Sequence, residues 1–324
     1  MTKKGGRRHP SSPNARVPVK NLWRNDAGNP QVPRLGSADM TFSIVGYDPR
    51  TKDLGVAVES KFPAVGAVVP FAQAGIGAIA TQAWANTSYG PRGLGMMKRG
   101  MTPSQVGKAL TAKDRGREKR QVGIVDAKGR SSSFTGGECD EWAGHLVGKH
   151  YACQGNILAS GQVVKAMALA FEQAQGDLPA KLLSALGAGQ AAGGDRRGQQ
   201  SAALIVVRAK GGYEGHNDRW IDLRVDDHAR PIEELTRIFH IWDLTMLTRE
   251  DPKNTVDITA DVAAYLQRYL AQVGAYDGPL NGTWDAQSEQ ALESWMGVEN
   301  LENKIRKDGK LWGSVWRYIR EGAR

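Results

Sequence analysis

The hydrophobic pattern of the chain changes sharply after Met40. Residues 1–40 show no periodicity and contain five prolines among scattered Gly, Ser and Asn residues, which is typical of a disordered segment. From Thr41 onward, short apolar runs end at turn residues, and this pattern predicts strands. The first predicted strands cover residues 41–47, 54–60, 66–71 and 75–82.

Helical signals begin at Thr102, which together with Pro103 and Gln105 has the residue types of a helix N-terminus. Adjacent strands interrupted by pairs of helices predict a layered α+β sandwich rather than a doubly wound parallel sheet. The later predicted strands cover 121–125, 131–135, 151–157, 202–208 and 220–225, and the later predicted helices cover 161–174, 178–187 and 232–245.

The C-terminal part of the chain has a pattern of its own. Val262, Leu266 and Leu270 keep helical spacing after a charged stretch that contains Pro252. We therefore predict a small helical module behind a linker. The predicted organisation is a basic disordered extension over 1–40, a main domain over 41–248, a linker over 249–257 and an all-α module over 258–324.

Composition and charge narrow the function classes. The 43 Lys and Arg residues exceed the 34 Asp and Glu residues, and residues 1–40 hold most of that excess. The charge from Thr41 onward is ordinary, so we expect no specific nucleic-acid partner. The sequence has no run of about 18 apolar residues, so we predict no membrane-spanning helix. No apolar stretch follows the basic residues near the N-terminus, so we predict no secretory signal peptide. With only two cysteines, we expect a cytoplasmic protein without a disulfide framework.

Thr41 is the first candidate for chemistry, because it opens the first strand directly after Met40. If the chain began at Thr41, the α-amino group, with a reference pKa of about 7.7–8.0, could act as base for the threonine hydroxyl. The alternative is an ordinary β-branched strand residue.

Several ordered, Gly-punctuated blocks resemble the bacterial domain-of-unknown-function family numbered 1028, over roughly residues 40–247. Members usually start Met-Thr-Phe-Ser, which corresponds to Met40 here, so the extension departs from the family. The resemblance implies a four-layer αββα sandwich of the N-terminal-nucleophile hydrolase type. The blocks include 41–45, 60–66, 88–94, 120–123, 154–158, 189–195, 197–203 and 218–228.

The resemblance also suggests roles for residues near Thr41. In such folds a lysine lowers the pKa of the nucleophile's amine, and Lys61 follows the second strand; a solvated strand-end charge is the alternative. Asn86 and Asn156 could donate to an oxyanion or could form turns. Asp195 could orient the amine, bind a charged substrate group or form a loop salt bridge.

Metal and cofactor motifs are not supported. Cys139, Cys153, His145 and His150 lack the spacing of a zinc site. The Gly-rich stretches do not combine strand, loop and helix as nucleotide-binding motifs do. We therefore expect neither a metal nor an organic cofactor.

The C-terminal module resembles peptidoglycan-binding-like domains over roughly residues 258–300. The matching positions include Leu266, Gln267, Gly274, Gly278, Gly282, Trp284, Asp285 and Trp295. The tryptophans could stack on sugars, although core packing explains them equally simply.

Three hypotheses follow. The first is an amidohydrolase in which Thr41 attacks a small amide or peptide-like substrate, as a cytoplasmic homodimer. The second is a non-catalytic binding or assembly protein on an inactive hydrolase fold, with a peptidoglycan-like ligand for its helical module. The third is nucleic-acid binding through the basic extension over residues 1–40, which predicts a steep salt dependence.

Overall fold

The computed structural model describes residues 41–322. The predicted extension over residues 1–40 lies outside this part of the chain. In the described part, antiparallel strands form two larger sheets and one small sheet, and eight α-helices accompany them. This arrangement confirms the predicted mixture of antiparallel strands and paired helices.

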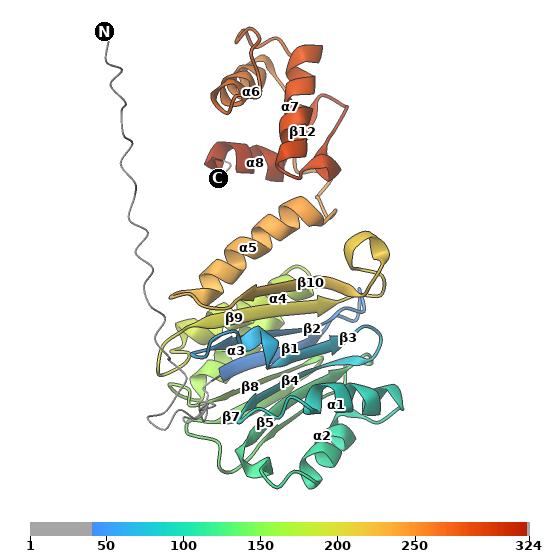
Figure 1. Ribbon diagram of the computed structural model, residues 1–324, viewed down its shortest axis with the longest axis vertical. Helices are drawn as coiled ribbons and strands as arrows, with labels where there is room; N and C mark the ends of the chain where they lie inside the picture. Colours follow the sequence, from blue (N-terminus) through green and yellow to red (C-terminus); the bar gives the residue numbers. More distant parts are fainter. Residues whose placement is uncertain (1–40, 323–324) are drawn as a thin grey trace, which may run out of the picture. The chain divides into compact units, whose positions relative to one another are not determined.

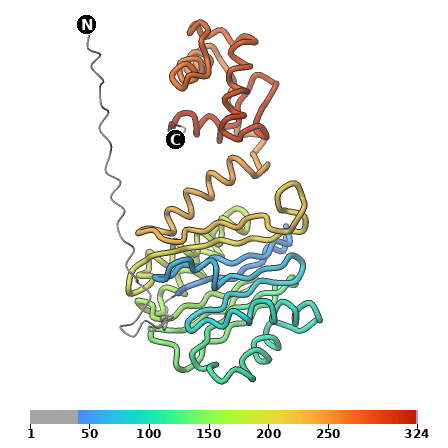
Figure 2. The backbone as a smooth tube through the Cα atoms, in the orientation of Figure 1, coloured from blue at the N-terminus to red at the C-terminus, as the bar shows by residue number. Residues whose placement is uncertain are grey.

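The larger sheet has six strands in the order β10-β9-β2-β1-β8-β7, and every neighbouring pair is antiparallel. Strands from distant parts of the sequence therefore run side by side (Figure 2). The central strand β1 is buried on both faces. The strand bounds are β1 Thr41–Tyr47, β2 Leu54–Ser60, β7 Gly144–Gly148, β8 Tyr151–Asn156, β9 Ser201–Val207 and β10 Arg219–Val225.

The second sheet has four strands in the order β3-β4-β5-β6. An apolar cluster that includes Val45, Val56 and Ala80 packs the two sheets against each other. Alternation along β1 thus directs Val45 toward the second sheet and Phe42 and Ile44 toward the helices. The bounds are β3 Pro70–Gln73, β4 Gly77–Ala83, β5 Arg120–Asp126 and β6 Ser131–Thr135.

Helices cover the outer face of each sheet (Figure 1). Helices α3, α4 and α5 share an apolar core with the six-stranded sheet. Helices α1 and α2 pack on the four-stranded sheet through Ile79, Val106 and Ile124. The bounds are α1 Tyr89–Lys98, α2 Pro103–Ala112, α3 Gln162–Gln173, α4 Leu178–Ala191 and α5 Pro231–Met246.

Three segments of the main domain differ from the sequence prediction, and the first is β7, Gly144–Gly148, which was not predicted. The predicted strand over 66–71 is a 3₁₀ turn at Val65–Ala67 followed by β3. Helix α1 is absent from the prediction because its glycines and proline have low helix propensity. Packing outweighs propensity there, since a Cβ at Gly90 would come within 2.1 Å of the Phe71 ring.

The C-terminal part is a helical module, as predicted, with one small addition. Strand β11, Thr255–Asp257, lies inside the predicted linker and pairs with β12, Lys310–Trp312. Trp295, which is buried, packs in the core of the module. The module's helices are α6 Ala260–Gln272, α7 Ala286–Val298 and α8 Gly313–Glu321.

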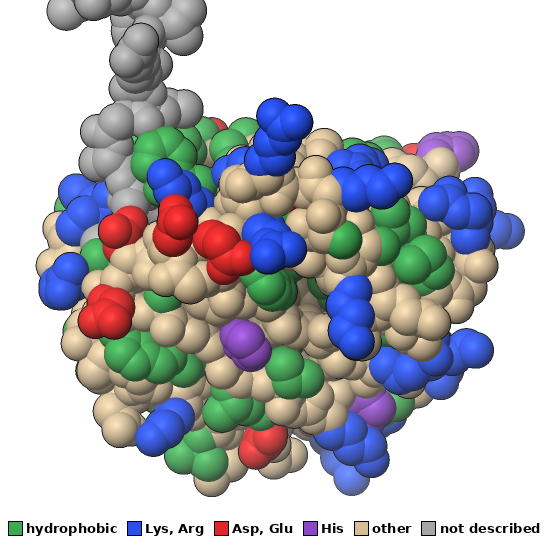
Figure 3. All heavy atoms as spheres, turned by 90° about the horizontal axis from the view of Figure 1, so that it is seen from below, with side chains coloured by type: hydrophobic (Ala, Val, Ile, Leu, Met, Phe, Trp, Pro, Cys, Tyr) green, Lys and Arg blue, Asp and Glu red, His purple; other side chains and the backbone are tan. Residues whose placement is uncertain are grey.

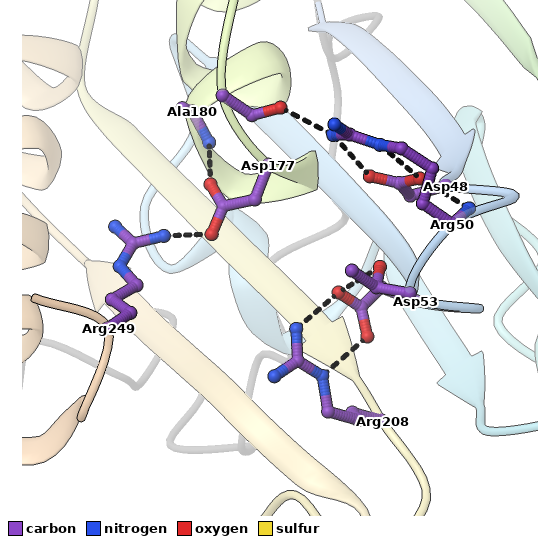
Figure 4. A network of polar contacts seen from close by, with 9 residues as sticks. Asp48, Arg50, Asp53, Asp177, Ala180, Arg208 and Arg249 are labelled. Atoms are coloured by element: carbon purple, nitrogen blue, oxygen red, sulfur yellow. Dashed lines mark hydrogen bonds and ion pairs between the residues drawn. The ribbon is translucent and has the colours of Figure 1, made fainter. Parts of the chain in front are cut away.

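Ion pairs gather at the end of the six-stranded sheet where β1 turns into β2, opposite Thr41 (Figure 4). The Asp53 side chain is fully buried, and Arg208 donates two hydrogen bonds to it, at 2.8 and 2.7 Å. Asp177 caps helix α4 and accepts a further hydrogen bond from Arg249. These contacts tie the β1–β2 turn to β9 through Arg208 and to the segment before α4 through Arg50, which donates to Gly176 O at 2.9 Å.

Candidate functional site

Thr41 lies at the start of the central strand, between Ser60 of β2 and Asn156 of β8. Its side chain is only 2% exposed. The Oγ1 atom is 3.0 Å from the Oγ atom of Ser60. Because Thr41 and Val45 have the same parity along β1, the hydroxyl faces the second sheet.

Two carboxamides bind the backbone carbonyl of Thr41, and a third, from another strand, binds both of them. Gln82 Nε2 donates to this oxygen at 3.0 Å, and Asn156 Nδ2 donates to it at 3.4 Å. Both amides also donate to Oε1 of Gln121, at 2.7 and 3.2 Å. The Nε2 atom of Gln121 in turn donates to Gly155 O at 2.8 Å, Thr135 Oγ1 at 2.9 Å and Gly144 O at 3.1 Å. These contacts fix which end of each amide faces Thr41.

The backbone is strained directly beside two of these amides. Ala83, which follows Gln82, has φ of 61°, and Ile157, which follows Asn156, has φ of 50°. A β-branched residue in the left-handed region is a clear outlier. Such strain persists where the surroundings over-determine the conformation, which is common at functional sites.

The structure brings one of the two predicted asparagines to Thr41. Asn156 is the last residue of β8 rather than a loop residue, and it binds the carbonyl of Thr41 itself. Asn86 lies elsewhere, where its Nδ2 donates to Asp114 Oδ2 at 3.0 Å. Burial acts to raise the pKa of Asp114, but hydrogen bonds from Arg120, Asn86 and Tyr89 outweigh burial and lower it.

Lys61 follows β2, as predicted, and its ammonium group contacts the backbone of another loop. The exposed Nζ atom donates to Gln199 O at 3.1 Å. Its backbone N–H donates to Asp195 Oδ2 at 3.0 Å. Lys61 therefore contacts the α4–β9 loop rather than the threonine hydroxyl.

Asp195 lies beyond the start of β1. It forms a β-bridge with Leu158, two residues after Asn156, and accepts the backbone N–H of Lys61. Thr41 pairs with Asn156 on one side and with Ser60, the residue before Lys61, on the other. Asp195 therefore contacts the residues that follow both strand partners of Thr41. The buried carboxyl group, whose pKa burial raises, also binds Arg197. The predicted loop salt bridge is thus present, and it stands at the head of the central strand.

Glu59 is a residue of this end that the sequence reasoning missed. It is 0% exposed, and its carboxyl oxygens have no hydrogen-bond partner among residues 41–322. Burial, and then the charge of Asp195, raise the pKa of Glu59 well above its usual range, although the nearby backbone N–H of Gln200 and the charges of Arg197 and Lys61 act in the opposite direction. The available signal was an acidic residue within an otherwise buried strand, Leu54–Ser60.

Metal and thiol chemistry find little support in the described part of the chain. Residues 41–322 contain no group of three His, Cys, Asp or Glu side chains that could hold a metal ion. Burial raises the pKa of Cys139 to about 11, which keeps this thiol protonated and unreactive. Within the same residues, no helix has the length and apolar character needed to span a bilayer.

Comparisons with known proteins divide the chain in two. The family model described as "Family of unknown function (DUF1028)" matches residues 41–235, and one described as "Putative peptidoglycan binding domain" matches residues 245–319. The crystal structure of protein SPO2555 from Silicibacter pomeroyi, which carries the DUF1028 family model, is similar at 30% identity and a TM-score of 0.58. That similarity covers 63% of this chain and 86% of the other. No curated protein matches the chain. This chain belongs to the DUF1028 family and carries a peptidoglycan-binding-like domain at its C-terminal end.

Proposed function

We propose that the protein hydrolyses a small amide or peptide-like substrate, with Thr41 as an N-terminal nucleophile. The observation that carries the proposal is the position of Thr41 at the head of the central strand, with its hydroxyl between two stacked antiparallel sheets. Helices on both outer faces agree with the αββα sandwich of N-terminal-nucleophile hydrolases.

The chemistry needs removal of the residues before Thr41. The freed amine takes the hydroxyl proton while Oγ1 forms a bond to the substrate carbonyl carbon. The amine then gives this proton to the leaving nitrogen as the carbon–nitrogen bond breaks. Water adds to the resulting ester, releases the acid and restores the threonine hydroxyl.

The surrounding residues have separate roles in this proposal. We assign to Asp195 the orientation of the freed amine, because it accepts the backbone N–H of Lys61, next to the strand partner Ser60 of Thr41; its carboxylate would favour the ammonium form. The positive charge of Lys61 has the opposite effect, because it disfavours the ammonium form of the amine without a direct contact. Gln82 and Asn156 hold the carbonyl of Thr41, so we assign them to positioning the nucleophile instead of binding the oxyanion.

Two mass-spectrometric measurements test the proposal. Intact mass determines whether the purified protein begins at Thr41. A β-lactone probe then tests nucleophilicity, because ring opening leaves a stable acyl ester on a reactive threonine. We expect labelling of the wild type and of the exposed-loop control Thr87→Ala, and none of Thr41→Ala. An intact chain that starts at Met1, with no adduct, would falsify the mechanism.

The C-terminal domain supports a second, separable function, which is binding of a peptidoglycan-like glycan. The family match over 245–319 favours it. Because Trp295 is buried and the Trp316 ring packs against Tyr265, the partly exposed Trp284 is the better candidate to contact a sugar. We expect the full chain to sediment with purified sacculi, and Trp284→Ala to stay in solution. Equal sedimentation of both proteins would argue against this assignment.

The proposal includes a cytoplasmic homodimer. Cell fractionation tests the location, and light scattering coupled to gel filtration tests the dimer. A monomer by light scattering would remove the dimer without affecting the proposed chemistry.

A further inference from the structure

Helices α1 and α2 and the turn after them carry a group of cations that the proposed function does not use. All six side chains are exposed. We call this group the basic face, and it consists of Arg92, Lys98, Arg99, Lys108, Lys113 and Arg115. Figure 3 shows the side of the molecule that includes these helices; Lys and Arg lie on both halves of this face, and most Asp and Glu lie on one half only, so the other half is predominantly basic.

None of these six side chains forms an ion pair with an acidic group of residues 41–322, although the next two cations along the chain do. Arg117 pairs with Glu118, and Lys119 pairs with Glu138. Asp114 is the one acidic residue between Trp84 and Arg117 in the sequence. Its carboxylate accepts hydrogen bonds from Asn86, Tyr89 and Arg120, so it leaves the basic face uncompensated.

The chain-wide charge hides this concentration. From Thr41 onward the positive excess is small, because acidic residues elsewhere offset the six cations. Three of the cations, Arg92, Lys98 and Lys108, lie within α1 and α2, which an apolar cluster packs on the sheet, and the other three lie in the short segments after these helices. A fixed array of like charges focuses the local field more strongly than the same charges spread over the surface.

The surroundings of the cations favour a hydrated polyanion over a lipid surface. The large exposed apolar side chains among residues 41–322 all lie outside α1 and α2. A membrane-bound helix needs such side chains for insertion. Beside the cations, Gly100 has nothing within 4 Å of an added Cβ position, and Gly95 has only the end of Arg99. These open positions allow a polymer backbone to approach closely.

We propose that the basic face binds the phosphate backbone of double-stranded nucleic acid without sequence specificity. Contacts with phosphates position a protein on the duplex but carry no sequence information. We therefore expect the basic face to bind different DNA sequences with similar affinity. Six phosphate contacts correspond to a slope of about −5 in a plot of log K against log salt, at about −0.9 for each contact.

Fluorescence anisotropy with a labelled 20-base-pair DNA duplex, titrated from 50 to 200 mM NaCl, tests the proposal on the full chain. The face variant is Lys98→Gln/Arg99→Gln/Lys108→Gln. Its matched control is Lys128→Gln/Lys149→Gln/Lys210→Gln, which removes three other exposed cations that have no ion pair among residues 41–322. All proteins keep residues 1–40, so any contribution of that segment is the same in each.

We expect the face variant to bind more than tenfold more weakly at 100 mM NaCl and to lose about 2.7 from the salt slope. The control should stay within twofold of the wild type. If the face variant fails to fold by circular dichroism, Arg92→Gln/Lys113→Gln/Arg115→Gln takes its place. Equal affinities of face variant and wild type would overturn the proposal, as would binding to vesicles of anionic phosphatidylserine without binding to DNA.

Discussion

Replacing Gln121 by methionine is the sharpest test of how the candidate site is built. Methionine keeps the length and approximate volume of the side chain but removes all of its hydrogen bonds. Gln121 is fully buried, accepts from Gln82 and Asn156, and donates to two backbone carbonyls and one hydroxyl. Each buried group left without a partner costs about 1–3 kcal/mol.

Several buried groups lose one partner in this variant: the carbonyl of Gly155 loses the Gln121 donor, and the amide of Gln82 keeps only Thr41 O and Gln154 O. We therefore expect Gln121→Met to lower the free energy of unfolding by about 2 kcal/mol, measured by urea unfolding of the full chain. The exposed Gln173 of α3 provides the matched control. Gln173→Met should change the free energy of unfolding by less than about 0.5 kcal/mol.

The same variant should also slow β-lactone labelling of Thr41, because Gln82 and Asn156 lose the acceptor that orients them. A Gln121→Met protein as stable as Gln173→Met would refute the hydrogen-bond network as described. A destabilised variant that is labelled at the wild-type rate would separate the network from the positioning of Thr41.

Three further predictions concern other buried charges. Glu59→Gln should gain stability relative to the wild type as pH rises from about 5 to 8, because the raised pKa of Glu59 makes its ionisation costly only in the folded state; thermal melts across this range check the sign. Asp53→Asn should lower the free energy of unfolding by about 2–4 kcal/mol, because Arg208 keeps its charge without the paired carboxylate. Urea unfolding measures this change, with Asn217→Asp as a surface control. Lys304→Met should leave Glu250, 2.9 Å from the Lys304 ammonium, unpaired and should speed proteolysis near residue 250; unchanged cleavage would contradict this.

The sequence predicted Thr41 and Asn156 as neighbours of one site only through the family resemblance. Strand periodicity located β1 and β8 but says nothing about which strands pair, and their pairing brings these two residues together. Gln82 and Gln121 were missed because a glutamine near a strand end has no local signature. Their importance depends on a second sheet packing over the first, which is a tertiary property.

Two predicted site residues contact other parts of the chain. The family resemblance and their places beside strands suggested Lys61 and Asn86 as neighbours of Thr41. In the structure Lys61 Nζ donates to Gln199 O and Asn86 Nδ2 donates to Asp114 Oδ2, and neither contact can be read from the local sequence. The head of β1 is instead occupied by Asp195, which comes from a loop far away in the sequence. Its position follows from the bridge to Leu158.

The arrangement around Thr41 bears directly on which base could activate its hydroxyl. Among residues 41–322, the partner of this hydroxyl is the Ser60 hydroxyl, which is no base at neutral pH. The side chains that bind the carbonyl of Thr41 are neutral carboxamides. Of the two nearby carboxyl groups, Asp195 binds Lys61 N and Arg197, and Glu59 lies on the alternate side of β2, since β-strand side chains alternate. A hydroxyl enclosed in this way needs a base within its own residue. The proposed chemistry therefore depends on a free α-amine, and a protein that keeps residues 1–40 should be inert toward the β-lactone until those residues are removed.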